Sequence, residues 1–257
     1  MTLHLRQICL VAQELAPVVD ALRKVFSIEP CHVDPGVGKF GLENTLLAVG
    51  SNFIEIVAPV QDDTAAGRFL KRRGGDGGYM VICQVPTRQE QEDVRQRAAG
   101  NNIRVAYDSD RGDWHIMQLH PADMGASFLE VEWDSEADMT GNWHPAGGKG
   151  WKDTVCRDVI SDITAAELQS DDPEALAQRW ATVLGLPLQQ EANALTISLT
   201  NAHLRFVQAR DGRGDGLGGI DVRVKDWARL LDQAKQAGVR MSDDLIVMGG
   251  FRFHLVD

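Results

Sequence analysis

Apolar residues follow two spacings along this chain, one typical of strands and one typical of amphipathic helices. Residues 5–12 form a nearly continuous apolar run that predicts a strand, and apolar residues recur at helical spacing over 14–26. Two further runs, 44–49 and 52–57, are separated by a Gly-Ser pair, which predicts a hairpin. The first quarter of the chain is therefore predicted to be a β-α-β-β-β unit.

The same unit returns three times. The elements predicted for the later copies are, in chain order, strand 79–85, helix 87–99, strands 103–107, 114–119 and 127–133; strand 160–168, helix 172–185, strands 195–199 and 203–208; strand 219–224, helix 227–237, and strands 245–247 and 251–256. Four copies of one supersecondary unit predict two paired domains. We expect a first domain at 1–134, a linker at 135–157 and a second domain at 158–257. Trp143 and Trp151 in the Gly-rich linker are expected to pack against the protein and not to contact a ligand.

Two predicted strands carry a glutamate between apolar residues. In NFIEIVAP (52–59), Glu55 shares a strand face with apolar neighbours, and the opposite face is apolar as well. The pattern returns in FLEVEW (128–133) with Glu130. A buried carboxylate costs several kcal/mol unless it is protonated, hydrogen-bonded or bound to a cation. These two glutamates are therefore the strongest candidates for chemistry.

Composition and charge narrow the range of partners. With 257 residues, 44% hydrophobic and 25% charged, the chain is typical of a globular protein with a substantial core. A formal net charge of -11 disfavours nucleic acid and anionic membrane surfaces, so the expected partner is a small molecule. Four cysteines without close spacing predict free thiols in a reducing compartment. The N-terminus lacks the signal-peptide pattern and no apolar stretch is long enough to span a membrane, so we expect a cytoplasmic protein.

Two segments connect this repeat pattern with a known family. GRFLKRRG (67–74) leads into a strand, and HPADMG (120–125) leads into Phe128-Leu129-Glu130. With the paired β-α-β-β-β order, they resemble the vicinal oxygen chelate superfamily, which includes glyoxalase I, methylmalonyl-CoA epimerase, extradiol dioxygenases and bleomycin-resistance proteins. Segment 120–131 is most similar to the epimerase-like members. The resemblance covers nearly the whole chain as architecture, but its motifs lie within 1–133.

The resemblance implies a fold class and an assembly. It implies an α+β fold of tandem βαβββ units, paired into two glyoxalase-like domains with curled mixed sheets. Members of the superfamily pair their units within one chain or across a dimer, so a homodimer is one expected assembly.

The resemblance also implies a metal site. In metal-dependent members, the first and last strands of two units supply four ligands to one divalent cation. Carried over by position, the implied ligands are Gln7, Glu55 and Glu130, and Met80 stands where histidine is usual. Three oxygen donors suit a divalent cation such as Zn, Ni, Mn, Co or Fe, whereas a thioether is a poor ligand for these ions. Two alternatives stay open: a cation with water in the fourth position, or a metal-free pocket in which the glutamates accept hydrogen bonds from neighbours such as Gln7 and Tyr79.

The implied activity is a metal-dependent lyase, isomerase or epimerase step on a small oxygenated metabolite. A glutamate, Glu130 by preference and Glu55 otherwise, takes or returns a proton on the carbon beside a carbonyl. The alternative function is a metal-free small-molecule binding protein of bleomycin-resistance type. The predicted substrate-binding residues are Tyr79, Met80, Trp114 and His115.

The second pair of units lacks a comparable set of ligands. The corresponding positions hold Ala165, Arg205, Gly219 and His254. This disfavours an extradiol dioxygenase, whose two histidines and one glutamate lie in the C-terminal pair of units. Arg205 is expected either to bind a carboxylate or phosphate group or to form an ion pair within the protein. We expect the C-terminal half to be mainly structural.

Overall fold

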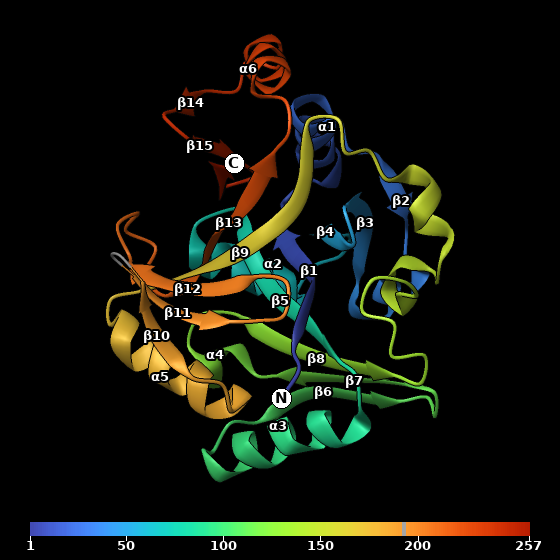
Figure 1. The fold of residues 1–257 in the computed structure, drawn as a ribbon, viewed down its shortest axis with the longest axis vertical. Coiled ribbons are helices and arrows are strands. Elements are labelled where there is room, and N and C mark those ends of the chain that lie inside the picture. Colours follow the sequence, from blue (N-terminus) through green and yellow to red (C-terminus); the bar gives the residue numbers. More distant parts are fainter. Residues whose placement is uncertain (192–193) are drawn as a thin grey trace. The chain divides into compact units, whose positions relative to one another are not determined.

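The protein is described here by a computed structural model, which describes residues 1–191 and 194–257 (Figure 1). Its helices are α1 (Leu15–Phe26), α2 (Ala65–Arg73), α3 (Arg88–Gly100), α4 (Pro121–Met124), α5 (Pro173–Leu184) and α6 (Trp227–Gln236). Short 3-10 helices lie at Pro35–Phe40, His144–Ala146 and Gly150–Thr154.

The strands follow the predicted repeat. They are β1 (His4–Val11), β2 (Pro30–His32), β3 (Leu42–Val49), β4 (Asn52–Pro59), β5 (Gly77–Val85), β6 (Val105–Asp110), β7 (Trp114–Leu119), β8 (Phe128–Asp134), β9 (Ile160–Ser170), β10 (Leu188–Glu191), β11 (Ala194–Ser198), β12 (His203–Gln208), β13 (Gly216–Val224), β14 (Met241–Ser242), β15 (Leu245–Met248) and β16 (Phe251–Val256).

In the described part of the chain, these strands form two eight-stranded sheets. Their orders are β2-β3-β4-β1-β5-β8-β7-β6 and β10-β11-β12-β9-β13-β16-β15-β14. The sheets are mixed, because β5 pairs with β8, β12 with β9 and β13 with β16 in parallel, while the hairpins pair antiparallel. The predicted α+β class, with tandem βαβββ units and mixed sheets, is confirmed.

The chain also divides into two compact units, which are described separately below. Unit 1 comprises Met1–Gln7, Tyr79–Thr140 and Ala165–Gly218, and unit 2 comprises Ile8–Gly78, Gly141–Thr164 and Gly219–Asp257. Each unit thus draws segments from both halves of the sequence. The domain boundaries expected from the sequence, 1–134, 135–157 and 158–257, stay a prediction.

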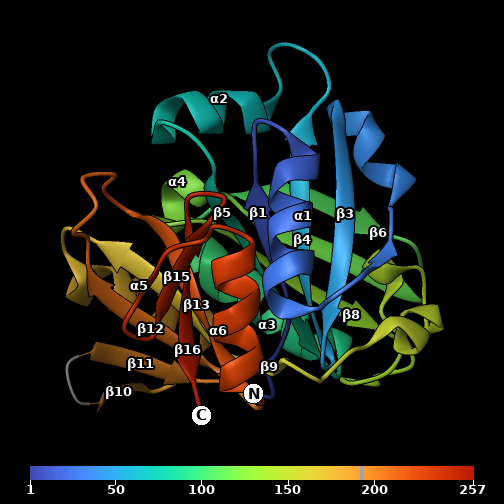
Figure 2. The ribbon, with the colours of Figure 1, turned by 90° about the horizontal axis from the view of Figure 1, so that it is seen from above.

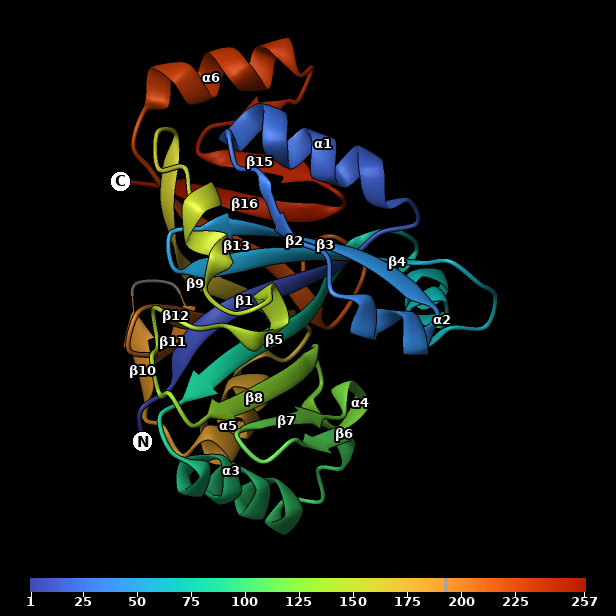
Figure 3. The same cartoon turned by 90° about the vertical axis from the view of Figure 1, so that its right-hand side faces the viewer.

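In unit 1, α3 and α5 begin at side-chain caps and pack together. The Thr87 hydroxyl accepts a hydrogen bond from an amide in the first turn of α3, and the Asp172 carboxylate does the same for α5. The Arg97 guanidinium of α3 donates to the Val183 carbonyl oxygen at 2.8 Å, near the last turn of α5. The Asn201 side chain bonds both the amide and the carbonyl of Leu5, as a neighbouring strand would. Figure 3 shows α3 beside the strands β8, β7 and β6.

In unit 2, α1 and α6 lie side by side (Figure 2). The apolar spacing of α1 buries Val18, Val19 and Leu22, and the Phe26 ring meets Phe253 of β16 edge to face at 5.3 Å. Gln233 of α6 donates to the Ser27 hydroxyl at 2.8 Å, just past the end of α1. The two predicted amphipathic helices therefore share one layer.

The segment predicted as a linker is anchored by its tryptophans. Trp143 and Trp151 are buried, and their rings lie 6.4 Å and 5.0 Å from the Phe53 ring of β4. The Trp151 indole also donates to the Gly141 carbonyl oxygen. The prediction that both tryptophans pack against the protein is confirmed.

Helix α2 was not predicted. Residues 65–73 present only three apolar positions that become buried, so their sequence carries little periodic signal. The Thr64 hydroxyl caps the helix at its start by accepting from the Gly67 amide, and Gly74 ends it in the left-handed conformation at φ 73°. Gly77 and Gly78, which follow the Gly-rich end of this segment, already belong to β5.

Among the residues that the structure describes, no helix is long and apolar enough to cross a membrane.

We predict that Trp151→Ala destabilises the protein by about 3–5 kcal/mol, because it leaves a cavity beside the Phe53 ring. Urea unfolding followed by circular dichroism measures this change. Asp153→Ala, at a nearby exposed position, is the matched control and should change stability by less than about 0.5 kcal/mol. Equal stabilities for the two variants would contradict the anchoring role of Trp151.

Candidate functional site

Strand β8 carries two buried carboxyl groups on one face. Glu130 and Glu132 are two residues apart, so their side chains project to the same side, and they are 4% and 1% exposed. The register of β7 against β8 places Gln118 opposite Glu130 and Ile116 opposite Glu132. Leu129 and Val131 project to the other face of β8.

Each of the two carboxyl groups accepts a hydrogen bond from a neighbouring side chain. The Gln118 amide donates to Glu130 Oε2 at 2.6 Å, and the Trp114 indole donates to Glu132 Oε2 at 2.6 Å. Glu132 Oε1 is buried and has no hydrogen-bond partner among the described residues. We call Glu130 and Glu132 the carboxyl pair.

The pKa of both members of the pair is raised. Burial raises the pKa of Glu132 well above its usual value, and the charge of Glu130 raises it further. Burial also raises the pKa of Glu130, but the hydrogen bond from Gln118 opposes that shift. Of the two groups, Glu132 is therefore the one that binds a proton more readily.

A buried arginine supplies positive charge beside the pair. Arg6 of β1 is completely buried, and its Nη1 donates to Gln84 Oε1 at 2.6 Å and to the Asp138 carbonyl oxygen at 3.1 Å. The Gln84 amide donates in turn to Asp134 Oδ2 at 2.9 Å. Burial lowers the pKa of Arg6 to about 10, while Glu132, Asp134 and Asp138 oppose the shift, so Arg6 remains charged at neutral pH.

The other predicted glutamate, Glu55, lies in unit 2. It is 7% exposed in the middle of β4, which confirms the predicted burial. The Asn44 amide of β3 donates to Glu55 Oε1 at 2.6 Å, and Asn44 Oδ1 accepts from the Asp34 amide. Asn44 thus fixes this carboxylate from the adjacent strand.

Strand parity separates several predicted site residues. Tyr79 and Met80 are consecutive on β5 and project to opposite faces. The register places Met80 opposite Phe128 and Ile82 opposite Glu130, so Met80 shares the face of the carboxyl pair. The Tyr79 ring meets the Phe128 ring edge to face at 5.2 Å.

The same parity separates Gln7 from Arg6. They are consecutive on β1, and Arg6 is the residue that reaches the polar cluster beside the carboxyl pair. Gln7 is buried, at 2% exposed. Its role as a ligand stays a prediction.

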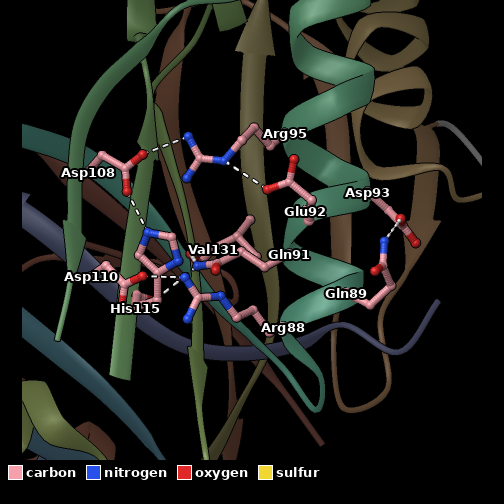
Figure 4. A network of polar contacts seen from close by, with 10 residues as sticks. All are labelled: Arg88, Gln89, Gln91, Glu92, Asp93, Arg95, Asp108, Asp110, His115 and Val131. Atoms are coloured by element: carbon pink, nitrogen blue, oxygen red, sulfur yellow. Dashed lines mark hydrogen bonds and ion pairs between the residues drawn. The ribbon is translucent and has the colours of Figure 1, made fainter. Parts of the chain in front are cut away.

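His115 belongs to a different polar network, on the opposite face of β7 from Trp114 and Gln118 (Figure 4). Its Nε2 lies 2.5 Å from Asp108 Oδ1 of β6, and Asp108 also pairs with Arg95 of α3 at 2.6 Å. Arg88 of α3 also forms an ion pair with Asp110 of β6. This network joins the edge strand to α3, so the structure places His115 away from the carboxyl pair.

The kinds of side chain available determine whether the divalent cation implied by the resemblance could bind. Within 1–191 and 194–257, no group of three or more His, Cys, Asp or Glu side chains is arranged to hold a metal ion. The oxygen donors of Gln7, Glu55 and Glu130 suit a hard divalent cation in kind, and the Met80 thioether does not. Glu55 belongs to the other compact unit, so this ligand set stays a prediction.

Comparison with known sequences assigns the chain to a family. The sequence model of a glyoxalase-like domain matches residues 8–184. The chain belongs to the glyoxalase-like domain family. The predicted resemblance to the vicinal oxygen chelate superfamily is thereby confirmed. No curated protein matches this glyoxalase-like chain.

Solved structures share the fold of this glyoxalase-like protein. A Mn(II)-bound glyoxalase from Novosphingobium aromaticivorans is 11% identical, with a TM-score of 0.69 over 98% of this chain and 81% of that one. A hypothetical protein from Staphylococcus aureus is 12% identical, with a TM-score of 0.66 over 100% of this chain and 99% of that one. A methylmalonyl-CoA epimerase from Mycobacterium tuberculosis is 20% identical and has a TM-score of 0.44 over 51% of this chain and 88% of that one. The two full-length likenesses show the fold alone.

The second glyoxalase-like sheet holds an ion pair where the first sheet is expected to bind its ligand. Arg205 of β12 lies directly opposite Glu167 of β9, and its Nη1 lies 2.6 Å from Glu167 Oε2. Of the two alternatives for Arg205, the structure confirms the internal ion pair.

The sequence analysis singled out Glu130 but not the residues that surround it and affect its pKa. Glu132 shares a strand face with Glu130, and its place two residues later was a usable signal. Gln84 and Arg6 interrupt apolar strands in the same way as Glu55 does. The Trp114 indole donates to Glu132, and its predicted contact with substrate stays a prediction. The polar interruptions were visible in the sequence, whereas their pairing depends on strand register.

We predict that Glu132→Gln changes the pH dependence of stability. A raised native pKa stabilises the protein below the usual glutamate pKa, and this contribution is lost as pH rises toward the native value. The glutamine side chain can still accept from Trp114, but it does not titrate. The stability of Glu132→Gln relative to the parent should therefore rise as pH is raised above about 4.5.

Urea unfolding at several pH values measures this difference. Glu43→Gln, at an exposed position of β3, is the matched control and should run parallel to the parent. A Glu132→Gln profile parallel to the parent would show that Glu132 is not a titrating buried acid.

Proposed function

We propose that this glyoxalase-like protein is a lyase, isomerase or epimerase that moves a proton on the carbon beside a carbonyl of a small oxygenated metabolite. One observation carries the proposal: the carboxyl group of Glu130 is buried, is oriented by Gln118 and has a raised pKa. A raised pKa brings a carboxylate closer to the working pH, which favours general base catalysis.

In this mechanism, each residue of the site has a separate role. Glu130 takes the proton from the carbon and returns it to the same or a neighbouring atom. Gln118 fixes the orientation of the Glu130 carboxylate through its amide, which restricts the base to one geometry. Glu132 is oriented by the Trp114 indole, and its charge when ionised acts on Glu130. Burial excludes water that would otherwise compete for the base.

Arg6 offsets the negative charge of this region. Its guanidinium interacts electrostatically with Glu132 and Asp134, and both interactions favour its charged form. Removing Arg6 would leave a buried excess of carboxyl groups, which proteins rarely tolerate. We assign Arg6 a positioning role, because its contacts are with protein groups.

A divalent cation is the cofactor that the glyoxalase-like family suggests. We propose Gln7, Glu55 and Glu130 as the residues that would hold it, through oxygen donors alone. When bound, such a cation polarises a carbonyl group and stabilises the charge that develops on its oxygen. Mn(II) in the glyoxalase from Novosphingobium aromaticivorans supports this proposal by analogy only.

A metal-free binding protein is the second candidate function. The supporting observation is Met80, whose thioether lies on the face of the carboxyl pair where a metal site would favour an imidazole. A thioether adapts well to an apolar or aromatic ligand. In either case the proposed partner is a small molecule.

We predict that Glu130→Gln abolishes proton exchange on the substrate. A panel of 2-oxo and α-hydroxycarbonyl compounds is incubated with the protein in D₂O, and NMR follows replacement of the C–H beside the carbonyl by C–D. Loss of the general base should slow exchange by about 10²-fold or more. Exchange as fast in Glu130→Gln as in the Glu43→Gln control would remove Glu130 from the mechanism.

We predict that Met80→His binds Mn²⁺ or Zn²⁺ at least about tenfold more tightly than the parent, because an imidazole replaces a thioether. Elemental analysis of protein purified without chelator, followed by metal titration, measures both proteins. If the parent holds about one metal per chain and Glu55→Ala loses it, the metal-dependent function is supported. If only Met80→His holds metal, the binding-protein alternative gains support.

A further inference from the structure

Helix α2 concentrates positive charge in a strongly acidic protein. The chain has 26 lysines and arginines against 37 acidic residues, yet four of these cations fall within residues 68–73. No acidic residue lies between Thr64 and Gly75. Positive charge is therefore concentrated on this short segment, although the protein as a whole has a net charge of -11.

Three of these cations form one exposed face. Arg68, Lys71 and Arg72 are spaced three and four residues apart, so they lie together on the helix surface, and all three are exposed. The opposite side of α2 buries Phe69 and Leu70 and lies against β4. We call Arg68, Lys71 and Arg72 the α2 basic face.

The α2 basic face differs from other exposed cations of the chain in its partners. Exposed arginines elsewhere form ion pairs with carboxylates at 2.7–3.3 Å, namely Arg23 with Glu29, Arg104 with Asp123 and Arg229 with Asp158. Within the described ranges, no carboxylate lies within ion-pair distance of Arg68, Lys71 or Arg72. The positive charge of this face is therefore not neutralised locally.

Two of the three side chains are already positioned without an acidic partner. Arg68 donates to the Asp63 carbonyl oxygen just before the helix, and the Arg72 guanidinium lies over the Phe69 ring at 5.3 Å from its centroid. Each contact uses a neutral group and leaves the charge available. Pre-positioned side chains lose less conformational entropy when a ligand binds.

We propose that the α2 basic face is an anion site that binds a phosphorylated small molecule through its phosphate group. Two guanidinium groups and one ammonium group supply the donors that recognise phosphate oxygens. A patch of one helical turn is too small for the many phosphate contacts of nucleic acid, and the acidic charge of the chain opposes a polyanion at long range. The proposal does not depend on proton transfer at Glu130.

Isothermal titration of the full chain with inorganic pyrophosphate and with inorganic phosphate tests the site. We expect saturable binding of pyrophosphate that weakens as salt is added, since exposed charges are screened over a Debye length of about 8 Å at physiological ionic strength. The variant Arg68→Gln/Lys71→Gln/Arg72→Gln should bind at least about tenfold more weakly.

A control of equal charge separates the site from a general charge effect. Lys24→Gln/Lys225→Gln/Lys235→Gln removes three exposed positive charges outside α2 and should bind pyrophosphate like the parent. Absence of pyrophosphate binding by the parent, or equal weakening in both triple variants, would overturn the proposal. Binding to phosphatidylserine vesicles without binding to pyrophosphate would also overturn it, in favour of a membrane surface.

Discussion

Two carboxyl groups buried side by side on a central strand set the main constraint on this structure. Glu130 and Glu132 cannot both be ionised away from water without a cost of several kcal/mol. The amide of Gln118 and the indole of Trp114 offset part of this cost, and burial raises the pKa of Glu132. Arg6 adds the only full positive charge that acts on Glu132 among the described groups. The identities of residues on β1, β5 and β7 follow from this requirement.

The glyoxalase-like fold makes this arrangement feasible. A βαβββ unit places its last strand between its first and third strands, so β8 is flanked by β5 and β7. Both neighbours can therefore supply donors to one face of β8, while α3 packs on the unit and its Gln91 amide reaches the Val131 carbonyl oxygen. The fold supplies the position of a base, and the side chains around it determine its pKa.

Much of the fold was predictable because periodicity reports local structure. The apolar alternation of 52–59 and the helical spacing of 14–26 specify elements without any tertiary information. Helix α2 was not predicted because only three of its residues are buried. The partners of Glu130 were not predicted for a different reason. The contact of Gln118 with Glu130 depends on the register between β7 and β8, which cannot be read from the sequence. The surroundings of His115 could not be predicted either. His115 and Trp114 are adjacent in the sequence, but their side chains project to opposite faces of β7.

The central claim is that Glu132 is a buried acid whose raised pKa keeps it protonated at neutral pH. Infrared difference spectroscopy between the parent and Glu132→Gln measures it directly, because a protonated carboxyl group absorbs apart from a carboxylate. We predict that the parent shows a buried protonated carboxyl band at pH 7 that is insensitive to moderate pH change and is absent from Glu132→Gln. A parent spectrum without that band at pH 7 would contradict the account.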